Sequence, residues 1–334
     1  MIDVLIDADV LGRQRTGDET YVENLLRALP AAAPELRFAA VTRHPGRVPD
    51  GVEALELAAG SQELRMAWRL PRLLRRVRPR LGHYQHALPL RPLGRSVVTV
   101  HDLSFERDAD FMPRKDRFIF KRNVSRAARN ADRVIAVSER TRDDLVELYA
   151  IPAETIRVIP HGVDPAFSPG DGDAGGYLLF VGAVQRRKDP RAALDAALDL
   201  GMPLVVVGPE REPALAAELR ELGADLRGYL EKDELAELYR GAACVLVPSR
   251  YEGFGLPLLE ALASGTPVVA APDPALVEVA GDAVVYAERE DLPGAVLHAL
   301  ERRVELRAAG LARASRFSWA EAAGRTADVY RELL

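Results

Sequence analysis

Seven residues separate Glu252 from Glu260 in the stretch YEGFGLPLLEALASGTPVVAA, and they include two glycines and a proline. A carboxylate accepts hydrogen bonds from two adjacent hydroxyl groups, so each glutamate suits a vicinal diol. A ligand held by both residues would therefore have a diol at each end.

The segment between the two glutamates has the pattern of an anion-binding turn. The run ACVLVPS predicts a strand, RYEGFG a turn and LPLLEALASG a helix, and Pro257 suits the first helical turn. Gly253 and Gly255 allow backbone angles or close approaches that other residues forbid. The start of such a helix offers N–H groups to a phosphate or diphosphate. A nucleotide-diphosphate sugar has the required order of diol, diphosphate and diol, so it is the predicted ligand.

Three further motifs stand at expected strand ends. Arg187 and Lys188 in QRRKD provide local positive charge, His101 ends the strand VVTVHD, and Gly17 lies in RQRTGDE. The alternatives are a solvated basic turn, a structural histidine and an ordinary turn glycine. GRQRTG does not match the dinucleotide fingerprint, and no phosphate-loop Gly-Lys-Ser/Thr follows it.

The composition is that of a two-domain globular protein. The chain has 334 residues, 48% apolar and 28% charged, with a formal net charge of −5. That charge argues against a general nucleic-acid partner. Cys244, the single cysteine, lies in an apolar run that predicts a buried strand, which fits a reducing compartment. No signal peptide and no membrane-spanning run is recognised, so we expect a cytoplasmic protein.

Short apolar runs alternate with helical patterns along the whole chain, which predicts a doubly wound α/β architecture. Strands are expected at 2–7, 37–42, 96–102, 132–138, 155–162, 177–182, 203–208, 244–249 and 266–271, and helices at 18–29, 114–130, 189–200, 232–241 and 290–303. The Gly-, Pro- and Asp-rich segment 162–176 predicts a boundary between two Rossmann-like domains, at 1–165 and 176–315. Ligands of such sheets bind beyond the carboxyl ends of the strands.

Taken together, these motifs resemble the retaining glycosyltransferases of family 4, which have the GT-B fold. PSRYEGFGLPLLEALASGTPVVAA resembles the family signature nearly throughout, and LGRQRTGDETYVENLLRAL, VVTVHDLSF, VIPHGVD and FVGAVQRRKDP resemble other family segments. The resemblance covers essentially the full chain. It implies two Rossmann-like domains facing a cleft, with the terminal segment of about 316–334 forming a helix that crosses back to the first domain.

The resemblance also implies roles for individual residues. Glu252 would contact the hydroxyls of the donor sugar and Glu260 the ribose. Arg187 and Lys188 would neutralise the diphosphate leaving group, although Ala183 stands where many relatives have an arginine. His101 would line the sugar pocket, and His161 would be a turn residue only. The remaining donor contacts would come from the segments that contain Gly17, Gly228, Tyr229, Gly253, Phe254, Gly255 and Leu256.

Retaining transfer in this family is described as attack on the same face from which the diphosphate departs, which requires no protein nucleophile and no cofactor. The patterns Asp7/Asp9 and Asp108/Asp110 are similar to a metal motif of the other large glycosyltransferase fold. Two aspartates at that spacing are common by chance, so we predict no metal site.

The stretch LRMAWRLPRLLRRVRPRLG is strongly basic. Arg65, Arg69, Arg72 and Arg76 are expected on one helical face beside a stripe of Met66, Leu70, Leu73 and Val77, with Pro71 interrupting the pattern. An ordinary helix with a solvated basic face is the favoured interpretation. The alternative is peripheral contact of residues 64–80 with the inner face of an anionic membrane.

The sequence thus predicts a retaining hexosyltransferase that acts on a glycan or lipid-linked acceptor. Relatives with the Arg-Lys loop are often mannosyltransferases, so GDP-mannose is the first donor to test and a UDP-sugar the second. The alternatives are a sugar-nucleotide epimerase of the same fold and a non-catalytic protein that binds nucleotide sugars.

Overall fold

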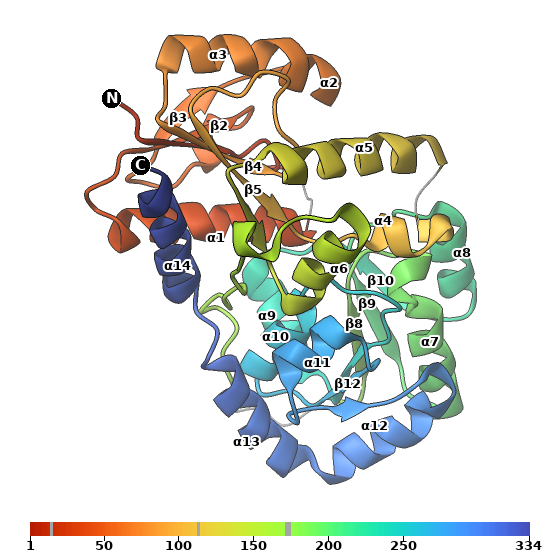
Figure 1. Cartoon of the computed structure of the whole chain (residues 1–334). Helices are drawn as coiled ribbons and strands as arrows, with labels where there is room; N and C mark the ends of the chain where they lie inside the picture. Colours follow the sequence, from red (N-terminus) through yellow and green to blue (C-terminus); the bar gives the residue numbers. More distant parts are fainter. Residues whose placement is uncertain (14–15, 112–113, 171–174) are drawn as a thin grey trace. The chain divides into compact units, whose positions relative to one another are not determined.

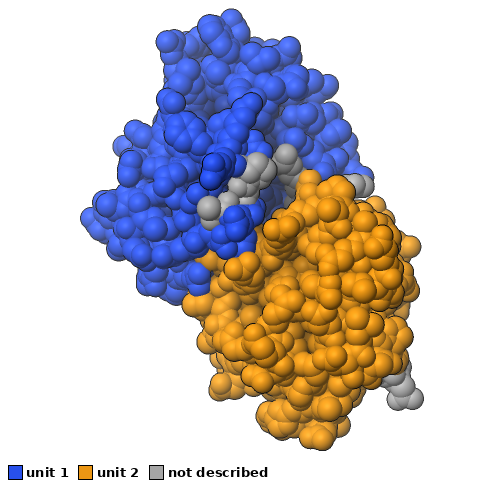
Figure 2. Space-filling model, turned by 90° about the vertical axis from the view of Figure 1, so that its right-hand side faces the viewer, with its two compact units in different colours: residues 1–162, 319–334 blue, residues 163–318 orange. Residues whose placement is uncertain are grey.

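The structure is a computed structural model that describes residues 1–13, 16–111, 114–170 and 175–334. The chain forms two compact units, one of residues 1–162 with 319–334 and one of residues 163–318 (Figure 2). Residues 171–174 of the predicted boundary segment 162–176 lie outside the described residues.

The first unit is built on a seven-stranded parallel sheet of order β3-β2-β1-β4-β5-β6-β7 (Figure 1). Its strands are β1 (Val4–Asp7), β2 (Phe38–Thr42), β3 (Glu53–Glu56), β4 (Leu81–Gln85), β5 (Arg95–Val100), β6 (Arg133–Ala136) and β7 (Ile156–Val158). Its helices are α1 (Thr16–Ala32), α2 (Gln62–Leu64), α3 (Leu70–Val77), α4 (Ser104–Arg107), α5 (Arg114–Asn130), α6 (Glu139–Tyr149) and α14 (Trp319–Leu333).

The second unit is built on a six-stranded parallel sheet of order β10-β9-β8-β11-β12-β13. Its strands are β8 (Leu178–Val181), β9 (Leu204–Val207), β10 (Asp225–Gly228), β11 (Cys244–Val247), β12 (Val268–Ala270) and β13 (Val285–Tyr286). Its helices are α7 (Pro190–Asp199), α8 (Pro213–Glu221), α9 (Lys232–Gly241), α10 (Leu256–Ala263), α11 (Pro274–Ala280), α12 (Leu292–Glu301) and α13 (Arg303–Ala314). Two parallel-sheet Rossmann-like units confirm the predicted fold class, and Cys244 is buried in β11 as expected.

The last helix completes the first unit, as the GT-B resemblance implies. Helix α14 packs against α1, although nearly the whole chain separates them (Figure 1). Within this contact the Tyr330 hydroxyl lies 2.6 Å from Nδ1 of His83, and the other ring nitrogen of His83 lies 2.7 Å from the Thr99 hydroxyl. Burial lowers the pKa of His83 to about 3, so the neutral ring joins β4, β5 and α14.

The basic segment differs from the prediction in one respect. Arg65 does not share an exposed face with the other arginines, because it is fully buried and its guanidinium binds the Asp7 carboxylate at 2.6 and 2.8 Å. The cause is a π-helical turn, Arg65–Arg69, in which the Leu70 amide donates to the Arg65 carbonyl. Pro71 follows this turn and has no N–H to donate, so the wider turn carries the helix into α3 without a break.

Candidate active site

The loop between β11 and α10 folds as the glycine and proline positions predict. Gly255 precedes α10 with φ of +100°, and an added Cβ atom there would lie only 2.5 Å from Cδ2 of Leu276. Any other residue would therefore be strained, and the Leu276 side chain would have to move. Pro257 occupies the first turn, and the beginning of α10 offers backbone N–H groups at the carboxyl edge of the sheet.

Glu252 is buried beside two cations. Its carboxylate oxygens lie 2.5 and 2.6 Å from Nζ of Lys188, and Oε2 lies 3.8 Å from the Arg187 guanidinium. Burial by itself would raise the pKa of Glu252, but the charges of Lys188 and Arg187 outweigh it and hold the pKa below its usual value. The carboxylate is therefore ionised at neutral pH and can accept hydrogen bonds from a diol.

Arg187 and Lys188 come from the 3₁₀ turn Arg186–Lys188, which follows β8. The Arg187 guanidinium donates to the Tyr251 carbonyl at 2.8 Å, and the Arg250 amide donates to the Arg187 carbonyl at 2.9 Å. These bonds hold the turn against the loop after β11. Arg and Lys side chains are common partners of phosphate oxygens, so this pair of cations suits a diphosphate.

The carboxyl ends of β8, β9 and β10 approach each other closely. Gly208 has φ of +143°, and an added Cβ atom there would lie 2.1 Å from the Gly182 carbonyl oxygen, so only glycine fits. The Gly208 amide also donates to the Gly228 carbonyl at 2.7 Å. Gly228 thereby belongs to this edge, and Tyr229, which follows it, is 44% exposed. These backbone segments form the rest of the predicted donor side.

Glu260 lies one turn into α10 in a different environment. The Tyr239 hydroxyl of α9 donates to Oε2 of Glu260 at 2.9 Å, and the Tyr239 carbonyl accepts from the Thr266 hydroxyl at 2.6 Å. Burial raises the pKa of Glu260 to about 7, against the lowering effect of the Tyr239 hydrogen bond. The pKa values of Glu252 and Glu260 are thus shifted in opposite directions, because the cations beside Glu252 outweigh its burial, whereas burial of Glu260 outweighs its hydrogen bond from Tyr239.

Phe254 and Leu256, which lie between the glutamates, point into the unit. Phe254 is 4% exposed and packs edge-on against Phe317 at a ring-centre distance of 6.0 Å. Leu256 is the first residue of α10 and is also buried. We therefore expect these two residues to contribute backbone amides to a ligand, as the sequence suggests, while their side chains anchor the loop.

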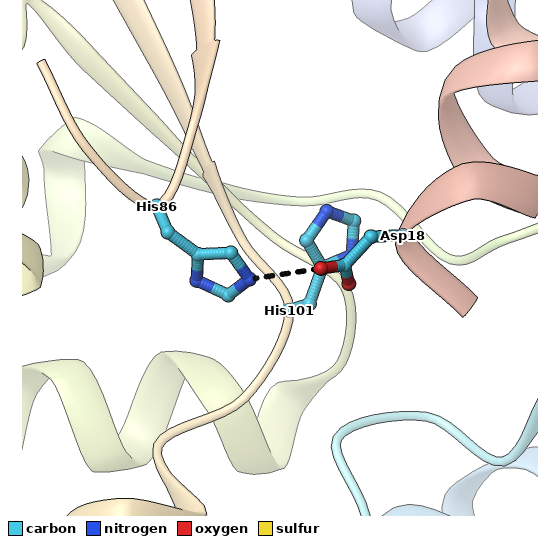
Figure 3. Close-up of side chains that lie close together, drawn as sticks. All are labelled: Asp18, His86 and His101. Carbon is cyan, nitrogen blue, oxygen red and sulfur yellow. Dashed lines mark ion pairs between the residues drawn. The ribbon is translucent and has the colours of Figure 1, made fainter. Parts of the chain in front are cut away.

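A separate cluster of polar side chains lies at the carboxyl edge of the first sheet (Figure 3). His101 follows β5, His86 follows β4 and Asp18 lies in the first turn of α1, next to Gly17. Nε2 of His86 lies 3.9 Å from Oδ2 of Asp18, and Nε2 of His101 lies 3.0 Å from Oε1 of Gln85. Burial lowers the pKa of His101 to about 4, so its ring is neutral at pH 7. Its single N–H, on Nε2, donates to Oε1 of Gln85, which leaves Nδ1 as an acceptor for a sugar hydroxyl.

His161 is more than the turn residue that the sequence suggested. It is buried, stacks on Trp319 with ring centres 5.6 Å apart and lies 5.0 Å from the Tyr21 ring. Its ring centre also lies 5.6 Å from that of His101, and burial holds the pKa of His161 well below the usual value. His161 therefore forms part of the apolar support behind His101.

Sequence reasoning missed Asp18, His86 and Tyr239. Asp18 lies inside the segment assigned to the first glycine loop. The sequence analysis therefore recognised the motif but gave the Asp18 side chain no role. His86 has a positive φ of 57°, which is uncommon outside glycine and is enriched at functional sites. No sequence signal pointed to it, because β4 was not predicted.

The structure shows which candidate metal ligands are paired with other side chains and which lie close together. The Asp7 and Asp9 carboxylates both bind arginines: Asp7 pairs with Arg65, and Asp9 pairs with Arg43 at 2.9 Å and with Arg13 at 3.0 Å. Asp108 accepts a hydrogen bond from the Asp110 amide. Within the described ranges, only Asp18, His86 and His101 offer three ligand atoms close together, all within 4.8 Å of one another.

Comparisons with known proteins support this architecture. The model of Glycosyltransferase Family 4 matches residues 15–167, and the model of Glycosyl transferases group 1 matches residues 168–310. The O-antigen chain mannosyltransferase B of Escherichia coli is 30% identical over 272 residues, which cover 72% of this chain and 71% of that protein. The chain belongs to glycosyltransferase family 4. The resemblance inferred from the sequence is thereby confirmed.

Other relatives match this glycosyltransferase over a smaller part of their length. The D-inositol 3-phosphate glycosyltransferase 1 of Catenulispora acidiphila is 39% identical over 243 residues, which cover 61% of this chain and 58% of that protein. The similar enzyme of Acidothermus cellulolyticus is 35% identical, and the match covers 61% of this chain and 54% of that protein. The chain thus spans less than two thirds of these two relatives.

Solved structures confirm the fold of the glycosyltransferase over its full length. The Anabaena protein HepE, solved with UDP and glucose, has a TM-score of 0.77 at 15% identity, with complete coverage of both chains. Sucrose-phosphate synthase from Thermosynechococcus elongatus has a TM-score of 0.76 at 21% identity, covering 100% of this chain and 99% of that one. At these identities the likeness extends to the fold alone.

Proposed function

We propose that the protein is a retaining hexosyltransferase that uses a nucleotide-diphosphate sugar and needs no metal ion. The observation that supports this most is the ion pair of the buried Glu252 carboxylate with the partly buried Lys188, next to Arg187 and the start of α10. A carboxylate for sugar hydroxyls and cations for a diphosphate are thus held side by side. Such preorganised charge stabilises a leaving diphosphate without a divalent cation.

The proposed reaction has one exchange of bonds at the anomeric carbon. The bond from this carbon to the diphosphate oxygen breaks, and an acceptor hydroxyl oxygen bonds to the carbon on the same face. The hydroxyl proton passes to an oxygen of the departing phosphate. Lys188 and Arg187 neutralise the charge that develops on the diphosphate, while Glu252 holds hydroxyls of the transferred sugar.

The other proposed contacts follow from the same assignment. Glu260 accepts hydrogen bonds from the ribose, and the backbone from Gly253 to Leu256 binds phosphate and sugar oxygens. Neutral His101 accepts a hydrogen bond from a sugar hydroxyl at Nδ1, because its Nε2–H donates to Gln85. Gly17 allows close approach of the diphosphate. In this assignment the predicted domain of residues 176–315 binds the donor. The predicted domain of residues 1–165, together with about 316–334, binds the acceptor.

The donor is proposed from the relatives. The name of the Escherichia coli relative supports a mannosyl donor and therefore GDP-mannose, whereas the UDP and glucose in the Anabaena structure support a UDP-sugar. We place GDP-mannose first and a UDP-sugar second, with a glycan or a lipid-linked glycan as the acceptor.

A thermal-shift panel of GDP-, UDP-, ADP- and dTDP-sugars with the free nucleotides tests the proposal. The preferred donor and its nucleotide should raise the melting temperature, since a ligand at 100 times its Kd adds about 2.7 kcal/mol. If no compound binds at millimolar concentration, the donor site is wrongly assigned. Incubation with radiolabelled donor then separates the alternatives: an epimerase returns an isomeric nucleotide sugar without transfer, and a non-catalytic binder leaves the donor unchanged.

A further inference from the structure

The outer surface of the first unit has a strongly basic face formed by two neighbouring helical segments. These are residues 62–77, which comprise α2, the π-helical turn and α3, and residues 114–130 of α5. Both cover the same side of the sheet, because the inward side chains Leu70, Leu74 and Val124 belong to one apolar core. We call the outward surface of these two segments, together with Leu90, the basic face.

The two segments are joined by the loop after β4. The Leu90 amide donates to the Met66 carbonyl at 3.0 Å, and the Arg126 guanidinium donates to the carbonyls of Leu88 and Pro89 at 3.0 and 3.1 Å. The basic face is therefore one continuous surface.

Its charge is opposite to that of the whole chain, whose formal net charge is −5. Residues 62–77 contain five arginines and one acidic residue, Glu63, and four of those arginines are exposed, because only Arg65 is buried. Residues 114–130 contain seven further Lys and Arg residues and one acid, Asp116. No carboxylate in the described ranges pairs with Arg72, Arg75 or Arg76. These three arginines are exposed, and no carboxylate of the described residues neutralises them.

Large apolar side chains lie exposed among these cations. Their exposed fractions are 55% for Leu64, 59% for Trp68, 59% for Leu90, 67% for Phe118 and 38% for Ile119. The Arg72 guanidinium lies over the Trp68 ring, 5.2 Å from its centre. Exposed Trp, Phe and Leu beside Arg is the composition of a surface that enters the boundary between lipid headgroups and acyl chains.

We propose that the basic face docks on an anionic lipid bilayer, with the arginines on lipid phosphates and Trp68, Phe118 and their neighbours among the acyl chains. A nucleic acid would match the cations and the two aromatic rings. It would leave Leu64, Leu90 and Ile119 without a role, because aliphatic side chains do not stack on bases. No helix in the described part of the chain is long and apolar enough to cross a membrane, so docking would be peripheral. The proposal is independent of the donor and of catalysis.

The first test uses the intact protein and its own tryptophans. The chain has two, and Trp319 is 7% exposed whereas Trp68 is 59% exposed. Phosphatidylcholine vesicles that contain phosphatidylglycerol should shift the Trp68 emission to the blue, and lipids brominated in their acyl chains should quench it. Vesicles of phosphatidylcholine alone should have a much weaker effect, and added salt should reverse binding. Unchanged emission with the anionic vesicles would refute the proposal.

Variants then locate the contact by vesicle sedimentation. Each cation near an anionic surface contributes a factor of about five in partitioning, so replacing two should reduce it about thirtyfold or more. We expect this for Arg72→Glu/Arg76→Glu, and a comparable loss for Trp68→Ser/Phe118→Ser. The matched controls, Arg211→Glu/Arg316→Glu and Leu297→Ser/Val304→Ser, change exposed residues of the second unit and should bind like the wild type.

Two outcomes would overturn the assignment. One is equal loss of vesicle binding in the basic-face variants and in the controls, which would mean that overall charge is responsible. The other is binding of single-stranded RNA, but not of anionic vesicles, through Arg72 and Arg76. In either case the thermal-shift response to nucleotide sugars would be unaffected, so failure of this proposal is distinct from failure of the proposed function.

Discussion

The replacement of Glu260 by glutamine tests the proposed donor site most directly, because the structure gives this residue an unusual charge state. Its carboxyl group is buried against the Tyr239 hydroxyl, and burial raises its pKa to about 7. The anion, which can accept hydrogen bonds from both ribose hydroxyls, is therefore populated above about pH 7 and is lost below it. Nucleotide affinity that depends on Glu260 should rise with pH through this range.

The magnitude follows from the loss of hydrogen bonds to a charged acceptor, which is about 1.5–3 kcal/mol or roughly 10- to 150-fold in Kd. At about pH 8 most of the carboxyl is ionised, so Glu260→Gln should show this full loss for the free nucleoside diphosphate. At about pH 6 most of it is protonated, so the same replacement should cost much less.

Glu252→Gln is the matched variant, because it makes the same chemical change in the loop that precedes α10. Cations hold the pKa of Glu252 below its usual value, so its effect should not change between these two pH values. Since the free nucleotide lacks the transferred sugar, its affinity should be nearly intact, while kcat with the donor should fall by roughly the same 10- to 150-fold.

Calorimetric titration of the wild type and both variants with nucleotide and with donor, together with initial rates, is the assay. Wild type and variant are compared at the same pH, so ionisation of the nucleotide affects both Kd values equally and does not change their ratio. A Glu252→Gln variant that binds free nucleotide tenfold more weakly, with Glu260→Gln normal, would show that the ligand orientation is reversed. If neither variant changes binding or rate, the loop is a structural turn.

Three further predictions concern metal, charge coupling and stability. Activity should survive excess EDTA, and full loss with rescue by Mn²⁺ would instead implicate an aspartate motif or the group Asp18, His86 and His101. Lys188→Met should lower the melting temperature, because breaking a buried pair costs about 3–5 kcal/mol. It should also weaken nucleotide binding, because a cation proposed to bind the diphosphate is lost. The double variant Lys188→Met/Glu252→Gln should be more stable than the sum of the two single effects predicts. Tyr330→Phe should destabilise the first unit by about 1–3 kcal/mol in urea titrations, since His83 loses its 2.6 Å hydrogen bond, without changing nucleotide affinity.

Apolar runs were sufficient to predict nine of the thirteen strands in the described residues, but four strands were missed. β3, β10 and β13 are at sheet edges or are very short, and edge strands need little apolar sequence. β4 is central, yet its sequence LGHYQ contains a glycine and two polar residues. It is stable in the core because His83 is neutral and both of its ring nitrogens have hydroxyl partners, and those partners are distant in sequence.

The donor-side residues were predictable because their motif is local, whereas their pairings were not. Sequence spacing places Glu252 and Glu260 on either side of a helix start, and it places Arg187 and Lys188 after a strand. It cannot indicate that Lys188 binds Glu252, which is 64 positions further along the chain, or that Tyr239 faces Glu260. Similarly, Arg65 was expected on the exposed face, because helical periodicity of 3.6 residues does not anticipate a π-helical turn before Pro71.

The pairing of Lys188 with Glu252 also bears on how the site could handle its ligand. The Glu252 carboxylate is buried and the Lys188 side chain is partly buried, so an isolated charge on either would be costly, and their pairing stabilises both charges. An ammonium group has three N–H donors, so it can serve both oxygens of a carboxylate and an oxygen of a phosphate together. Glu252, which is proposed to hold the sugar, and Lys188, which is proposed to neutralise the diphosphate, then hold each other in position. Such mutual positioning accounts for two charged side chains held next to a helix start that already favours an anion.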